Sequence, residues 1–107
     1  MDDQQLLIMM VPSDIRDDVV DCLMACAGIS GFNMTTMAGY SKEHSQYDVR
    51  EQVEGYRQYY KFEVLHGQMQ KAELLATLRP VCASSNIRYW IVPVLEQGHF
   101  DASLSAK

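Results

Sequence analysis

The chain has 107 residues, a mass of 12.2 kDa and a formal net charge of -5, with 14 acidic against 9 basic residues. This length allows one domain, and 48% hydrophobic with 21% charged residues is typical of a folded globule rather than a disordered segment. The basic residues are scattered singly and form no basic stripe, which argues against direct binding to DNA or RNA.

The sequence also carries no signal for export or for a membrane. No apolar run approaches the ~20 residues that cross a bilayer, so we expect no direct membrane insertion. The first residues are acidic, whereas a secretory signal begins with basic residues and has a longer apolar stretch. The 3 cysteines follow no disulfide-framework spacing, which indicates reduced thiols. These features predict a cytoplasmic protein.

Hydrophobic periodicity predicts strands and helices in the order βαββαβ. The expected strands cover residues 5–11, 32–41, 56–66 and 87–95, and the expected helices cover residues 13–28 and 68–78. Ser13 and Gly28 are the expected caps of the first helix. Pro80 is expected to end the second helix near Leu78 or to kink it, and Pro93 indicates an edge or a bulge in the last strand.

This order predicts a ferredoxin-like α+β sandwich, with a four-stranded antiparallel sheet and two helices on one face, in a single domain over residues 1–107. The first and last strands are apolar on both faces, since residues 6–11 contain no polar side chain and residues 87–94 contain one, Arg88. Two helices cover only one face of such a sheet, so the other face needs a different cover. The simplest cover is another copy of the chain, which predicts a homo-oligomer.

A long segment, residues 41–55, separates the second and third expected strands. Hairpin loops usually have about two to five residues, and longer ones often bind ligands or proteins. We expect Tyr47 and Arg50 in this segment to contact a partner protein that the sequence does not identify. The alternative is a solvated connection, part of which extends the hairpin. A polar tail is expected from residue 96 onward.

No residue pattern predicts catalysis, because the sequence contains no phosphate-binding glycine loop, no nucleophile elbow and no C-x-x-C pair. We therefore expect a protein that is not an enzyme. Cys22 and Cys26 have a spacing that could bind a soft metal, but both lie on the apolar stripe of the first helix, which favours packing. His44 and His99 could be brought together at a subunit interface to bind a divalent or copper ion.

With these elements assigned, the chain resembles the PII signal-transduction superfamily, and in particular an uncharacterised proteobacterial PII-like family whose domain has no assigned function. The residues that carry the resemblance are 7–12, which run into the first helix, and 87–94, followed by Glu96-Gln97-Gly98. The resemblance implies a homotrimer with a regulatory, ligand-sensing role. It also implies that ligands bind in clefts between subunits and that the 41–55 loop contacts a regulated protein.

The turn that holds nucleotide phosphates in PII proteins is glycine-rich and basic, whereas residues 79–86 here contain no glycine and one base. This difference argues against nucleotide binding of the PII kind. Our candidates for the ligand cleft are Gly39, Tyr40, Lys42, Arg57 and Arg88. The glycine would permit close approach of the backbone, and the basic residues would bind an anion.

Two further interpretations remain open at this point. The chain is also similar to CutA-like trimers, which would make it a divalent-metal-binding tolerance protein with His44 and His99 as ligands. A dimeric α+β barrel enzyme shares the protomer fold and would need a polar cluster inside the barrel, for which His66 and Tyr60 are the visible candidates. A ligand pocket or a packed surface could explain a group of aromatic residues, and we assign them to a sheet face or a subunit interface: Tyr56, Tyr59, Tyr60 and Trp90.

Overall fold

The computed structural model describes residues 2–40 and 57–102. The strands are β1 (Gln4–Pro12), β2 (Phe32–Gly39), β3 (Arg57–Gly67) and β4 (Arg88–Pro93), and the α-helices are α1 (Arg16–Met24) and α3 (Lys71–Cys82). Short 3-10 helices span Ser13–Ile15, Gln68–Gln70 and Ala83–Ser85. No helix in these ranges has the length and apolar character to span a membrane.

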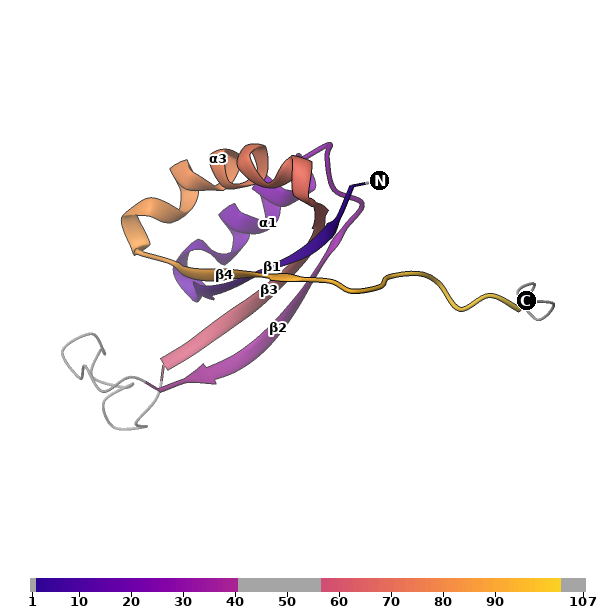
Figure 1. Ribbon diagram of the computed structural model, residues 1–107. Helices are drawn as coiled ribbons and strands as arrows, with labels where there is room; N and C mark the ends of the chain where they lie inside the picture. Colours follow the sequence, from indigo (N-terminus) through magenta and orange to yellow (C-terminus); the bar gives the residue numbers. More distant parts are fainter. Residues whose placement is uncertain (1, 41–56, 103–107) are drawn as a thin grey trace.

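The four strands form one antiparallel sheet in the order β2-β3-β1-β4, and the two α-helices cover the same face of it (Figure 1). This confirms the ferredoxin-like βαββαβ sandwich expected from the sequence. β2 and β4 are the two edge strands, which agrees with the edge position that Pro93 indicated for the last strand.

The hydrophobic core lies between the sheet and the helices. Its side chains are at most 3% exposed and comprise Leu7, Met9, Val11, Val19, Leu23, Phe62, Val64, Leu74 and Leu78. The sheet residues among them alternate along β1 and β3, because successive side chains of a strand point to opposite faces. Each fully buried side chain of this size contributes roughly 1.5–3 kcal/mol, so this one layer provides most of the hydrophobic stabilisation.

The opposite face, called the open face below, carries no helix (Figure 1). The strand register assigns to it Leu6, Ile8 and Met10 of β1, Met37 of β2, Tyr59 and Leu65 of β3, and Trp90 and Val92 of β4. None of these side chains is fully buried within the protomer. Lys61 and Glu63 also lie on this face, where the lysine Nζ is 3.9 Å from a carboxylate oxygen. The cover by another copy that the sequence predicted stays a prediction.

The first helix is shorter than predicted and uses neither expected cap. A 3-10 turn follows Pro12, no side chain caps it, and α1 begins only at Arg16. The helix ends at Met24, well before Gly28. At its end, the backbone N–H groups of Ala25 and Cys26 donate to carbonyls of the last turn, at 3.1 Å each. These bonds close the helix before residue 28, so Gly28 is not its cap.

The second helix continues through Pro80 to Cys82, so the expected end near Leu78 was wrong. Proline removes the N–H that would bond the carbonyl of Ala76, but both residues are exposed and water can satisfy that carbonyl. Val81 and Cys82 pack against the core and extend the buried stripe of the helix. Their burial offsets the cost of a proline in the last turn.

Candidate functional site

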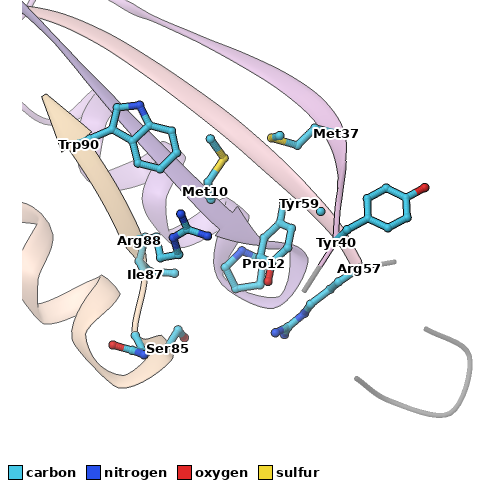
Figure 2. Close-up of a pocket in the computed structure, with 12 residues that line it drawn as sticks. Met10, Pro12, Met37, Tyr40, Arg57, Tyr59, Ser85, Ile87, Arg88 and Trp90 are labelled. Carbon is cyan, nitrogen blue, oxygen red and sulfur yellow. The ribbon is translucent and has the colours of Figure 1, made fainter. Parts of the chain in front are cut away.

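A hollow lies on the open face, at the end of the sheet where β2 ends and β3 begins. Its volume is about 670 Å³. Figure 2 shows the side chains around it. They come from four places: Met10 and Pro12 of β1, Met37 and Gly39 of β2 with Tyr40, Arg57 and Tyr59 of β3, and Ser85, Asn86, Ile87, Arg88 and Trp90 at the turn into β4. The antiparallel register explains this gathering, because Met10 lies opposite Arg88 and Pro12 lies opposite Tyr59.

Two arginine–aromatic pairs line the hollow. The guanidinium carbon of Arg57 is 5.5 Å from the centre of the Tyr59 ring, and that of Arg88 is 5.7 Å from the centre of the Trp90 ring. Both distances are within the range of cation–π attraction, which helps to hold each guanidinium in place. The two arginines come from different strands and flank Pro12 and Tyr59 (Figure 2). None of the described lining residues is acidic, so the hollow is suited to an anion.

Gly39 has a different role from the one expected. A Cβ at this position would lie 2.5 Å from two carbons of the Tyr59 ring, which is too close for any side chain. The glycine therefore makes room for the ring of Tyr59, rather than for a ligand approaching its backbone. Gly39 remains part of the site, because the Tyr59 ring occupies the space that a side chain at position 39 would fill, and the Arg57 guanidinium lies over that ring.

The turn into β4 is made without glycine. Asn86 adopts the left-handed conformation, with φ of 51° and ψ of 51°, and its N–H donates to the carbonyl of Ala83 at 3.2 Å. Asparagine tolerates this region better than most residues do. The turn places Ser85 and Asn86 at the wall of the hollow. From the sequence we looked for a glycine-rich turn at residues 79–86. Asn86 was the residue that could have predicted the left-handed turn, and it was missed.

The structure brings four of the five expected cleft residues together, namely Gly39, Tyr40, Arg57 and Arg88. The ring of Tyr40 points away from the hollow and is largely exposed (Figure 2). Lys42 lies outside the described residues, as do Tyr47 and Arg50 of the expected partner loop. Sequence reasoning missed Tyr59 and Trp90 as site residues, since aromatic side chains on a sheet face are more often packing residues.

The expected metal ligands are not brought together in the part of the chain that is described. His44 lies outside it, and His99 lies in the exposed segment after β4. Residues 2–40 and 57–102 contain no group of three or more His, Cys, Asp or Glu that could hold a metal ion. The metal-tolerance interpretation stays a prediction and gains no support from these residues.

The cysteines of α1 and α3 are partly buried against the core. The Cys22 thiol donates to the carbonyl of Thr77 at 3.4 Å. Burial raises the pKa of Cys22, and the neighbouring Cys26 adds to the shift. Burial also raises the pKa of Cys82. These are protonated thiols that act as small packing residues, in line with their place on the apolar stripe.

The polar candidates for a barrel enzyme lie on the wrong face. His66 pairs in register with Gln5, and Tyr60 pairs with Val11, which places both on the helix-covered side. His66 is 2% exposed, and its Nδ1 is 2.9 Å from the carbonyl oxygen of Gly67. Two open faces closing into a barrel would therefore enclose neither side chain.

Comparison with known proteins agrees with this fold. The family described as "Protein of unknown function (DUF3240)" matches residues 1–101. A DUF3240 family protein from Shewanella baltica OS155 is 37% identical in sequence, and its crystal structure superposes with a TM-score of 0.79 over 94% of this chain and 100% of that chain. No curated protein matches the sequence.

Two more distant structures share the fold. Arabidopsis thaliana PII, in a crystal structure bound to citrate, is 14% identical with a TM-score of 0.65, over 87% of this chain and 78% of that chain. A Bacillus cereus protein related to NIF3 is 13% identical with a TM-score of 0.68, and the match covers 92% of this chain but only 27% of that chain. The PII-like fold expected from the sequence is thereby confirmed.

Proposed function

The chain belongs to the DUF3240 family, and we propose that it is a small PII-like regulatory protein that senses an anionic ligand and is not an enzyme. It acts in the cytoplasm as a homotrimer. The ligand binds in a cleft between subunits, and its binding changes how the loop after Tyr40 contacts a regulated protein.

The observation that carries this proposal is the pair of arginines in the hollow on the open face. Arg57 and Arg88 are each held over an aromatic ring, and no described residue of the lining is acidic. A guanidinium offers several N–H donors in a planar array, which suits carboxylates and phosphates. The structurally similar PII from Arabidopsis thaliana is bound to citrate, a tricarboxylate, so an anion of this class is a reasonable first ligand to test.

The position of the hollow supports a regulatory role. Tyr40 and Arg57, which line it, are the last and first described residues on either side of the 41–56 segment. A ligand that contacts Arg57 therefore binds next to the point in the sequence where this segment begins and ends. Long loops attached to a rigid sheet are common sites of protein recognition.

The open face supports a site shared between subunits. The hollow opens onto a face whose side chains are apolar along β1 and are covered by no helix. A second copy placed against this face would bury the apolar side chains and would exclude water from the ligand. Exclusion of water strengthens the attraction between the two arginines and an anion.

Native mass spectrometry of untagged protein, followed by calorimetric titration with citrate and with ATP, tests this function. We expect a trimer that binds at least one of these anions. Arg57→Ala and Arg88→Ala should each weaken the binding by about tenfold or more, since a charge-assisted hydrogen bond is worth roughly 1.5–3 kcal/mol.

Arg79→Ala is the matched control, because Arg79 is an exposed arginine in the last turn of α3 and does not line the hollow. It should leave the affinity unchanged. Equal affinity for wild-type protein and both hollow variants would place the ligand elsewhere, and a monomer that binds neither anion would contradict the proposal as a whole.

A further inference from the structure

The segment that follows β4 extends away from the folded body of its own protomer. The N–H of Val94 donates to the carbonyl of Gln4 at 3.0 Å and ends the pairing with β1. Beyond it, residues 95–102, called the arm below, run outward as an extended chain (Figure 1). The two large apolar side chains of the arm, Leu95 and Phe100, are fully exposed. Both side chains are therefore available for a contact with another molecule.

The second feature is the outer edge of β2, which pairs with no other strand among residues 2–40 and 57–102. It is an edge strand of eight residues with no charged residue and no proline. Natural sheets usually protect such edges with charge, proline or a short strand, because an open edge pairs with other chains. The other edge strand, β4, does carry this protection, in Arg88 and Pro93. This difference between the two edge strands favours pairing of the β2 edge with a strand of another chain.

The spacing of apolar residues matches between the arm and β2. Leu95 and Phe100 are five positions apart, and so are Phe32 and Met37. An odd spacing places the two members of each pair on opposite faces of a strand. In β2 these faces are both accessible, since Phe32 lies on the helix side and Met37 on the open side, and neither is fully buried.

We propose that the arm of one protomer pairs with the β2 edge of a second copy of the chain, as an antiparallel fifth strand. In the register that follows, Leu95 lies opposite Met37 and Phe100 lies opposite Phe32. Gly98 then lies opposite Met34, a side chain that is 42% exposed and that a larger neighbour would crowd. The polar residues of the arm fall opposite threonine and asparagine, so that no like charges meet.

The arm cannot make this contact within its own protomer. β2 and β4 are opposite edges of the sheet, separated by β3 and β1, which places them about 14 Å apart at the usual strand spacing. The arm also runs away from the sheet rather than across it (Figure 1). A contact from the arm of one copy to the β2 edge of the next is head-to-tail, and such contacts form a ring when the rotation between copies closes. The inference rests on the self-assembly in the proposed function and adds the element that joins the subunits.

The first test replaces the two apolar side chains of the arm. In Leu95→Ser/Phe100→Ser we expect the dissociation constant of the assembly, measured by analytical ultracentrifugation, to rise about tenfold or more, because two large buried side chains are lost. Met24→Ser/Met69→Ser is the matched control, since both methionines are exposed and lie outside the arm and β2; it should assemble like the wild type. An arm variant that assembles like the wild type would overturn the inference.

The second test fixes the register with disulfides between two separately purified chains. His99→Cys mixed with Asn33→Cys should form a disulfide between chains on oxidation, because directly opposed residues in an antiparallel pair have Cα atoms about 4.5–5.5 Å apart. His99→Cys mixed with Thr36→Cys should not, since those positions face each other only in a parallel pair. Formation of the second disulfide, or of neither, overturns the antiparallel pairing. Neither result bears on anion binding, which Arg57→Ala and Arg88→Ala report separately.

Discussion

Both faces of the sheet carry apolar side chains, but these side chains differ in how far the protomer buries them. The helix-covered face holds side chains that are at most 3% exposed, such as Leu7, Phe62 and Val64. The open face holds Ile8, Met10 and Trp90, which are only partly buried in the protomer. The covered face therefore supplies the free energy of folding of one chain, whereas the open face keeps apolar surface available for contacts outside that chain.

The difference explains where the candidate site lies. A ligand site needs side chains that are not already committed to the core, and the open face offers them where β2 ends and β3 begins. Arg57 and Arg88 lie on that side of the sheet, each over an aromatic ring of its own strand. On the covered face, the neighbouring Tyr60 packs against the core.

The largest expected effect is a loss of stability when a core side chain is removed from the helix-covered face. Phe62→Ala should lower the free energy of unfolding by about 3–5 kcal/mol, because it removes a fully buried ring from the centre of the core. Urea denaturation at a fixed protein concentration measures the loss. Leu65→Ala is the matched control on the open face of the same strand and should cost clearly less. Equal losses for both variants would mean that the two faces do not differ in this way.

A smaller effect is expected when the open face is made polar. Ile8→Asn should weaken self-association by roughly 1.5–3 kcal/mol, since the isoleucine would no longer be buried in the contact. Size-exclusion chromatography with light scattering should detect smaller species, while circular dichroism shows an unchanged helix and strand content. Met24→Asn, a change of an exposed residue at the end of α1, serves as the control. A variant that unfolds instead of dissociating would place Ile8 in the protomer core.

The smallest expected effect is on the pH dependence of stability, and it comes from the cysteines of α1 and α3. Burial raises the pKa of Cys22 and Cys82 above the ordinary pKa of a cysteine thiol, so the unfolded chain loses these thiol protons first as the pH rises. The stability that the protonated thiols contribute is complete below that value and is lost as the pH rises through the raised pKa of the folded state.

Urea denaturation at about pH 8 and about pH 10.5 should therefore show a loss of stability that is smaller in Cys22→Ala/Cys82→Ala than in the wild type. The difference between the two proteins isolates the thiols from tyrosines and lysines, which titrate in the same range. The same pH dependence in both proteins would contradict the assignment.

The order of elements could be predicted from the sequence because β1 and β4 are apolar on both faces and because β2 and β3 alternate. Their bounds in the structure differ from the expected ones by one or two residues for most strand ends. The cap residues were wrong for a physical reason. The extent of α1 is set by the packing of Val19 and Leu23, and tertiary contacts of this kind override local signals such as Ser13 and Gly28.

The charged part of the candidate site could also be anticipated, because Arg57 and Arg88 stand next to predicted strand ends. The rest depends on distant pairings that no local pattern reveals. Met10 and Arg88 become neighbours only through the register of β1 with β4. Asn86 was missed because its left-handed conformation carries no periodicity, and Tyr59 because its ring occupies the space above a glycine on another strand.

The uncharged edge of β2 has a consequence for aggregation of the protein on heating. In the proposed assembly, a protomer that separates from its neighbours would present eight residues of charge-free edge strand, which is a template for cross-β aggregation. We then expect heating to cause precipitation faster than reassembly. The lifetime of such an assembly at high temperature would be set by the rate at which subunits separate, and not by the equilibrium stability of the single chain.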